Sequence, residues 1–274
     1  MALGYSYLTG LYYGLNNSQH LFILIFFSTT AAYNADRLPY FIQKDIQNAR
    51  YRVKFHLTHH WLAPLMVSMS LIVNLYILGN VSIKIKIFYI ITIFFTALYF
   101  YGVNMNLSTF KYRLAAILKP VIVSIVWSLV TVIYPFLEEP VDFNKDNIMF
   151  FIHRFLLFFS NCLWFDYRDK EGDLISKKPN IHQYINIKSF SLLLLAICFI
   201  DLFIINSLYH KHFNKMITHE FIPVFIYAGI IIPFLKHKIT LKKEKNLSEM
   251  FYPMIIDGVL ALPLFIIWLI IINH

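Results

Sequence analysis

The sequence is divided into apolar stretches, each about 20 residues long and bounded by charged or turn-forming residues. About 20 helical residues cross the roughly 30 Å hydrocarbon core of a bilayer, where a helix satisfies all of its own backbone hydrogen bonds. Charged residues make up 14% of the chain, whereas soluble domains contain about 25%. The pattern therefore predicts an all-α, polytopic membrane protein.

Hydropathy predicts nine apolar segments, which form a single transmembrane domain over residues 1–274. The first is short and rich in Tyr and Gly. In chain order, the segments are Leu3–Leu15, Ser18–Leu38, Thr58–Leu78, Ile85–Met105, Leu114–Pro135, Ile148–Tyr167, Phe190–Leu208, Glu220–Leu235 and Phe251–Ile272. The expected architecture is a nine-helix transmembrane bundle.

Lys and Arg residues are distributed unevenly between the loops. Of 24 in the chain, 17 fall in the loops after the second, fourth, sixth and eighth segments. Positively charged loops remain in the cytoplasm, so we expect the N-terminus inside and the C-terminus outside. This topology explains the net charge of +9 without a nucleic-acid partner. The bias toward Ile, Lys, Asn and Phe indicates an AT-rich bacterial genome, and hence the bacterial inner membrane.

Three aspartates with the spacing D-x-x-D-x-x-x-D follow the sixth segment, namely Asp166, Asp169 and Asp173. On a helix these spacings place all three on one face, where their mutual repulsion favours a bound cation. Carboxylates suit Mg²⁺, which keeps water ligands and bridges to phosphate. The alternative is a solvated acidic helix end neutralised by Arg168 and Lys170. Because acids at membrane spans are functional candidates, we favour a magnesium-held diphosphate.

The stretch Phe165-Asp166-Tyr167-Arg168-Asp169-Lys170-Glu171-Gly172-Asp173 resembles the second aspartate motif of the UbiA-type membrane prenyltransferases. That family has nine transmembrane helices, and its two aspartate motifs follow helices two and six on the cytoplasmic side. Phe110-Lys111-Tyr112-Arg113, followed by Leu118-Lys119-Pro120 and Trp127, resembles the family's basic loop after helix four. The resemblance covers most of the chain.

The first aspartate motif departs from the family pattern N-D-x-x-D-x-x-x-D. The corresponding stretch is Tyr33-Asn34-Ala35-Asp36-Arg37-Leu38-Pro39-Tyr40. Only Asn34 and Asp36 remain as groups that face a metal, so one of the two Mg²⁺ sites is depleted. Arg37 is a candidate to hold phosphate directly, since a guanidinium binds phosphate in a bidentate manner.

The resemblance implies Mg²⁺-dependent transfer of an isoprenyl group from an isoprenyl diphosphate to a hydrophobic acceptor, inside the bilayer and without an obligate protein partner. The implied catalytic residues are Asp36, Asp166, Asp169 and Asp173; with Asn34 they are also the implied metal ligands. The implied diphosphate-binding residues are Asn34, Arg37, Lys111, Arg113 and Arg168. Ring faces stabilise cations, and the candidates to line the pocket for the allylic cation are Tyr99, Phe100, Tyr101, Trp127 and Trp164.

Two other functions stay open at this point. The incomplete first motif is compatible with a non-catalytic member that binds or carries an isoprenoid lipid. The stretch His56-Leu57-Thr58-His59-His60 reads H-x-x-H-H, one of the boxes of membrane di-iron desaturases and hydroxylases. The remaining histidines form no second box on the cytoplasmic side, which disfavours the di-iron alternative.

Lys119, Arg154 and Asp201 are among the charged residues that fall within predicted segments. Lys119 is close enough to a segment end for its ammonium to reach the nearby interface. Arg154 and Asp201 are both expected in the outer half of the membrane, where they are candidates to pair.

Overall fold

The computed structural model describes residues 1–35, 38, 58–104, 109–139, 141–175, 178–211, 222–224 and 226. Within these ranges the regular secondary structure is entirely helical. The elements are α1 (Ala2–Tyr13), α2 (Gln19–Ala35), α5 (Leu62–Leu78), α6 (Ile83–Asn104), α7 (Thr109–Ser128), the π-helical turn η2 (Leu129–Ile133), α8 (Tyr134–Glu138), α9 (Lys145–Ile175), the 3₁₀ turn η3 (Ile181–Gln183) and α10 (Ile187–Lys211).

Four helices are long and apolar enough to cross a membrane. They cover Ile83–Phe100, Tyr112–Glu138, Lys145–Lys170 and Ile187–Leu208. Their apolar side chains remain widely exposed on the protein surface, including Ile90, Phe199 and Phe203. Because water penalises apolar surface of this extent, it is suited to contact with lipid. The all-helical prediction is therefore confirmed for the described residues, and their long apolar helices are compatible with an integral membrane protein.

The first seven predicted segments each correspond to described helical structure, with differences at their ends. The first segment forms a helix of 12 residues, about 18 Å long at 1.5 Å per residue, which is too short to cross a bilayer. The eighth predicted segment is described only at residues 222–224 and 226, and the ninth lies outside the described residues.

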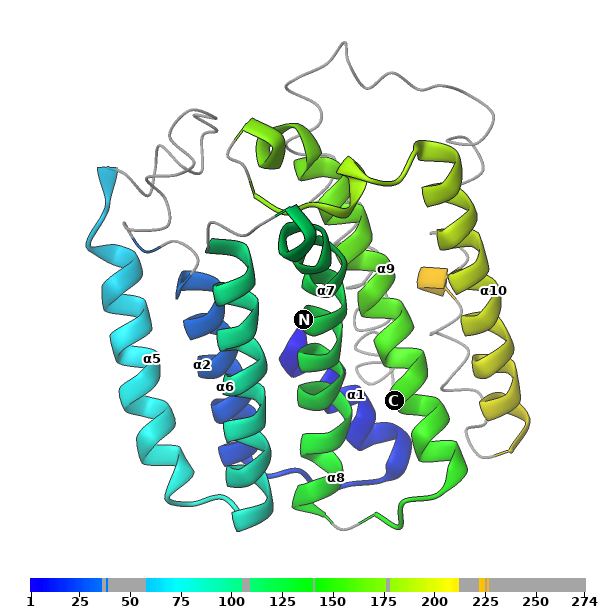
Figure 1. The fold of residues 1–274 in the computed structure, drawn as a ribbon. Coiled ribbons are helices and arrows are strands. Elements are labelled where there is room, and N and C mark those ends of the chain that lie inside the picture. The colour runs from blue at the N-terminus through cyan, green and yellow to red at the C-terminus, as the bar shows by residue number, and fades with distance from the viewer. Residues whose placement is uncertain are drawn as a thin grey trace.

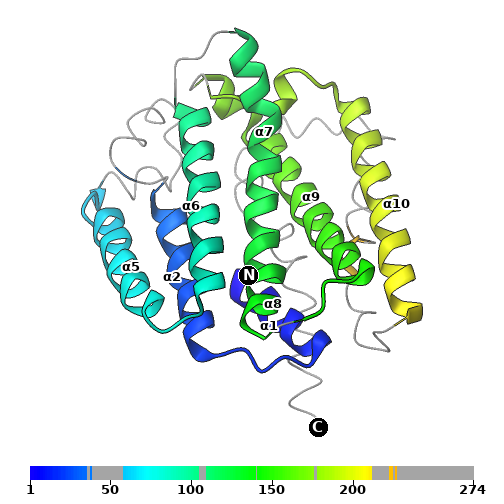
Figure 2. The ribbon, with the colours of Figure 1, turned by 60° about the horizontal axis from the view of Figure 1, so that its bottom comes forward.

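The long helices stand side by side, and successive long helices along the chain run in opposite directions (Figure 1). Helix α2 packs along α5, α6 packs on α7, and α9 lies between α7 and α10. In both views α5 and α10 lie at opposite edges of the described helices, while α1 and α8 gather at one end (Figure 2). At the other end, α2, α6 and α9 finish and α7 and α10 begin. We call it the motif end, because it carries Asp166–Asp173.

Helix α1 packs inside the bundle against η2. Its Tyr5 and Leu8 are fully buried, and Gly14 ends it in the left-handed conformation at φ 66°. The hydroxyl of Thr9 donates a hydrogen bond of 2.7 Å to the carbonyl of Thr131 within η2. A π-helical turn disturbs the regular backbone ladder, so a carbonyl there benefits from this side-chain donor.

Helix α9 is longer than its hydropathy predicts, since it runs for 31 residues and includes the whole aspartate motif. Its start is fixed by Asn144, whose side-chain oxygen accepts hydrogen bonds of 3.0 Å from the backbone N–H groups of Asp146 and Asn147. Hydropathy alone ends the segment at the first charged residues, but the helix continues because Asp166 and Asp173 are buried against other elements. All three motif aspartates therefore lie on α9, although the predicted segment ended at Tyr167.

Candidate functional site

Two of the three motif aspartates converge on one lysine at the motif end. The Nζ atom of Lys119, on α7, lies 2.8 Å from Asp166 Oδ1 and 3.5 Å from Asp173 Oδ2. Both aspartates are buried, with exposed fractions of 5% and 9%. They are seven residues apart on α9, so two helical turns bring them to the same face. Lys119 thus points into the bundle toward the motif.

Asn180 fixes the geometry of this pair from the segment that follows α9. Its side chain is fully buried, and its Nδ2 donates to the backbone carbonyl of Asp166 at 2.7 Å and to Asp173 Oδ2 at 2.8 Å. As the N-cap of η3, it accepts at Oδ1 a hydrogen bond of 2.9 Å from the backbone N–H of His182. One amide therefore joins two turns of α9 to the returning chain.

The returning chain is held at two further points. The backbone N–H of Lys178 donates to the carbonyl of Asp173 at 2.8 Å. The carbonyl of Lys178 accepts hydrogen bonds from the Tyr112 hydroxyl and, at 3.1 Å, from Gln183 Nε2. Residues 178–183 therefore form a fixed cover beside the motif.

Asp169 is placed differently from its two neighbours. Its carboxylate accepts both a 2.9 Å bond from Arg168 Nε and a 2.7 Å bond from Arg168 Nη2, and it is 28% exposed at the side chain. The same guanidinium lies 4.6 Å from the centre of the Phe165 ring. The motif is thus divided into a buried pair and a more exposed, arginine-bound member.

Burial controls the protonation behaviour of two groups that follow the membrane span. It raises the pKa of the Asp173 carboxyl, and the nearby Lys119 ammonium and the Asn180 amide counteract that rise. It lowers the pKa of His182 to about 4. His182 packs edge-on against the Tyr167 and Phe190 rings, with centroid distances of 5.2 and 4.3 Å. Its Nε2 donates to the Leu163 carbonyl at 3.2 Å, as fits a neutral imidazole.

The remaining predicted residues are placed in part. Asn34 lies in the last turn of α2, and its Nδ2 donates to the Thr30 carbonyl of the same helix at 2.8 Å. Asp36 and Arg37 lie outside the described residues, as does the side chain of Lys111. Arg113 lies at the motif end, with its guanidinium 5.5 Å from the centre of the Tyr184 ring.

Aromatic side chains connect the helices beneath the motif. Tyr33 of α2 lies 6.2 Å from Trp127 of α7, which in turn lies 5.3 Å from Phe158 of α9. Trp164 is buried and meets Phe190 edge-on at 5.5 Å. Of the other aromatic residues expected from the sequence, Tyr99 and Phe100 meet edge-on at 5.3 Å. The side chain of Tyr101 is outside the described part.

Oxygen ligands for a cation are available at the buried pair. Within the described residues, Asp166 Oδ2 is buried and has no hydrogen-bond partner, although buried carboxylate oxygens normally have one. No group of three or more His, Cys, Asp or Glu side chains in the described ranges is arranged to hold a metal. The buried pair therefore offers part of a Mg²⁺ coordination shell, which water and phosphate oxygens commonly complete.

A second polar region lies at the opposite end of the bundle. His153 Nδ1 and Asp201 Oδ1 lie 2.8 Å apart and are both buried, so Asp201 has a histidine partner that the sequence did not indicate. The guanidinium of Arg154 lies 4.4 Å from the centre of the Tyr5 ring and 4.9 Å from that of Phe150. These contacts fit the need of buried charges for compensating partners.

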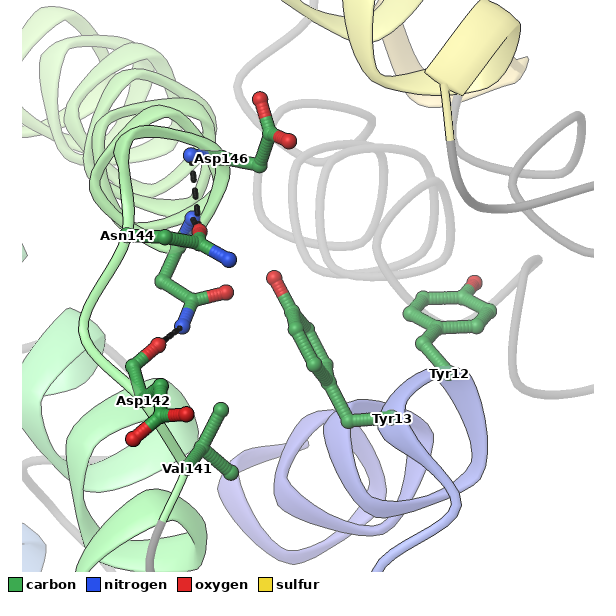
Figure 3. Close-up of a pocket in the computed structure, with 7 residues that line it drawn as sticks. Tyr12, Tyr13, Val141, Asp142, Asn144 and Asp146 are labelled. Atoms are coloured by element: carbon green, nitrogen blue, oxygen red, sulfur yellow. Dashed lines mark hydrogen bonds between the residues drawn. The ribbon is translucent and has the colours of Figure 1, made fainter.

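A cavity of about 300 Å³ lies at this opposite end (Figure 3). It is lined by Tyr12, Tyr13, Val141, Asp142, Asn144, Asp146 and Asn147. Tyr13 projects from α1 toward the start of α9, and burial raises its pKa, with a further rise from Asp146. The cavity does not coincide with the aspartate motif, so the site at the motif end is identified by its charged side chains.

Sequence reasoning did not select Asn180 or His182, because an isolated Asn or His after a helix carries no spacing signal. Lys119 is conspicuous in the sequence because it is a charged residue within an apolar segment. The sequence does not indicate which way its side chain points. Comparisons with protein-family models, curated proteins and solved structures found no match to this chain.

Proposed function

We propose that this chain is an intramembrane prenyltransferase of the UbiA type, which moves an isoprenyl group from an isoprenyl diphosphate to an apolar aromatic or lipid acceptor. One observation carries the proposal. Asp166 and Asp173, at the end of an apolar helix, converge on Lys119. Burying ionisable groups at the end of an apolar helix costs free energy, so their presence there points to a function.

The chemistry of this group suits a diphosphate. Two carboxylates supply hard oxygen ligands for Mg²⁺, and Asp166 Oδ2 has no hydrogen-bond partner within the described residues. Lys119 and Arg113 supply positive charge at the same end of the bundle. A metal-bound diphosphate needs carboxylates to bind the metal and cationic side chains to bind the phosphates, and this site offers both.

The proposed reaction requires the diphosphate to leave as an anion. Bound Mg²⁺ would supply charge neutralisation of the leaving group. Lys119, Arg113 and the predicted Arg37 would add fixed positive charge, which is most effective in a dry site of low dielectric. The bond between the first isoprenyl carbon and the diphosphate oxygen breaks, the acceptor forms its bond to that carbon, and the acceptor's displaced proton passes to water.

An apolar bundle suits the isoprenoid chain. The helices beneath the motif present Trp127, Phe158 and Trp164, whose ring faces would stabilise an allylic cation. The proposal includes a bundle of nine helices, of which α1 is too short to cross the bilayer, with both motifs facing the cytoplasm of a bacterium. In support, the ends of α2 and α9 lie at the same end of the bundle (Figure 1).

A non-catalytic, isoprenoid-binding protein is the second candidate. The first motif favours this candidate. The side chain of Asn34 donates its hydrogen bond to the backbone of its own helix, α2, and Asp36 is the one aspartate in the stretch Tyr33–Tyr40. Such a protein would bind the lipid diphosphate without releasing diphosphate. A turnover measurement therefore distinguishes the two candidates.

The test uses detergent-purified full-length protein with labelled geranylgeranyl diphosphate, Mg²⁺ and a panel of quinone, phenol and lipid-alcohol acceptors. We expect diphosphate release and a labelled prenylated product, both abolished by EDTA. Asp166→Asn should remove turnover, whereas Asp142→Asn, an exposed acid at the opposite end, should retain it. Binding of the labelled donor without release across the whole panel would favour the non-catalytic candidate.

A further inference from the structure

The buried carboxylate pair is only partly neutralised by the side chains around it. Asp166 and Asp173 have side-chain exposures of 6% and 12%, whereas Lys119 is 18% exposed. When both carboxylates are ionised, the single ammonium of Lys119 compensates one of the two negative charges, and the other charge stays uncompensated. A buried excess charge is costly. A stronger cation at the same position would balance the pair.

The lysine ammonium occupies the place that such a cation would take. Its Nζ is 2.8 Å from one carboxylate and 3.5 Å from the other, so it bridges the two turns of α9. A divalent ion between the same oxygens would neutralise both carboxylates completely. It could also use Asp166 Oδ2, which lacks a hydrogen-bond partner in the described part of the chain.

The carboxylates and the lysine differ in how firmly they are held. Asn180 binds Asp173 Oδ2 and the backbone carbonyl of Asp166, so the Asp173 carboxylate and the turn of α9 that carries Asp166 are held independently of Lys119. The lysine ammonium ends a flexible chain of four carbons and is the most exposed group of the three. It can therefore leave while the aspartates remain.

We propose that Lys119 is an internal counter-ion that occupies the cation position between Asp166 and Asp173 in the metal-free protein and moves to the substrate phosphate when a divalent cation binds. This inference rests on the proposed function, because it takes the buried pair as a metal site. It assigns Lys119 two positions, one on the carboxylates and one on phosphate.

Two consequences follow from this exchange. Lys119 competes with the metal, so its removal should strengthen metal binding. Once released, the ammonium strengthens phosphate binding, so metal and pyrophosphate should each increase the affinity for the other through the lysine. Such coupling is reciprocal and typically amounts to about 5- to 150-fold in affinity.

The experiment measures Mn²⁺ binding to the detergent-purified full chain by electron paramagnetic resonance, with and without inorganic pyrophosphate. We expect Lys119→Met to bind Mn²⁺ about 10-fold more tightly than the wild type, and to lose most of the enhancement by pyrophosphate. Lys170→Met is the matched control. It removes the same charge from an exposed position on α9, and its Mn²⁺ affinity should stay within about twofold.

The outcomes separate the inference from the proposed function. If Lys119→Met binds Mn²⁺ as well as the wild type or more weakly, and Asp166→Asn does not bind it, the exchange is refuted and the metal site is supported. Absence of Mn²⁺ binding in both the wild type and Lys119→Met overturns the metal site and the exchange together.

A second measurement uses the wild-type protein alone and does not depend on the folding of a variant. Acetylation by a water-soluble amine reagent is followed at each lysine by mass spectrometry. Mn²⁺ should increase the modification of Lys119 severalfold relative to Lys170, and added pyrophosphate should reverse the increase. Unchanged labelling of Lys119 on saturation with Mn²⁺ contradicts the exchange.

Discussion

The side-chain amide of Asn180 donates a 2.8 Å hydrogen bond to Asp173 Oδ2 and thereby fastens the segment after α9 to the last turns of that helix. Because the same nitrogen also binds the Asp166 carbonyl, the two buried turns of the motif are fixed to one group. The site therefore depends on a residue outside the aspartate motif.

Asn180→Ala should lower the free energy of unfolding by about 1–3 kcal/mol, because it leaves a buried carboxylate and a carbonyl without their donor. The measurement is thermal unfolding in detergent. Asn80→Ala, at an exposed position, is the control and should change stability by less than about 0.5 kcal/mol. A fully stable Asn180→Ala protein would show that the amide does not hold the motif.

Acid should destabilise the protein through His182. Its pKa is about 4 in the folded state and about 6.5 when unfolded. The unfolded chain therefore binds more protons between these values, so this contribution is complete above pH 6.5 and is lost as pH falls toward 4. The upper limit of the loss is about 3 kcal/mol. Between pH 7 and pH 4 in detergent, the free energy of unfolding should fall more steeply for the wild type than for His182→Gln. Equal slopes for the two proteins would contradict a role of His182 in acid destabilisation.

Asp169→Asn separates a functional role of this carboxylate from a structural one. Its contact with Arg168 is partly exposed, so its loss should lower stability by less than about 1 kcal/mol. If Asp169 supports the metal-bound diphosphate, prenyl transfer should nevertheless be abolished. Product formation and thermal unfolding are measured on the same preparation, and full activity in the variant would exclude Asp169 from the site.

The buried pair of His153 and Asp201 should contribute to packing between α9 and α10. Asp201→Ala removes one partner of this hydrogen bond and leaves the other buried, for which we expect a loss of about 1–3 kcal/mol. Asn206→Ala, an exposed position on the same helix, should be close to neutral. A double-mutant cycle with His153→Gln measures the coupling directly, and a coupling energy near zero would rule out a stabilising pair.

The helices were predictable because a bilayer imposes a simple physical rule on sequence. A chain that crosses it must be apolar over about 20 residues and must satisfy its own backbone groups. That rule found α6, α7, α9 and α10. It failed at the first segment, where α1 is a short helix packed inside the bundle, because hydropathy does not distinguish burial in lipid from burial in protein.

The aspartate motif was likewise visible in the sequence, since helical spacing alone places Asp166 and Asp173 on one face. Its partners were not. Lys119 and Asn180 meet it only when α7 packs on α9 and the chain after α9 folds back. The sequence therefore determined the long apolar helices and the acidic helix face. Only the tertiary structure decided which charges compensate that face, because side-chain contacts between distant segments depend on packing and leave no local pattern.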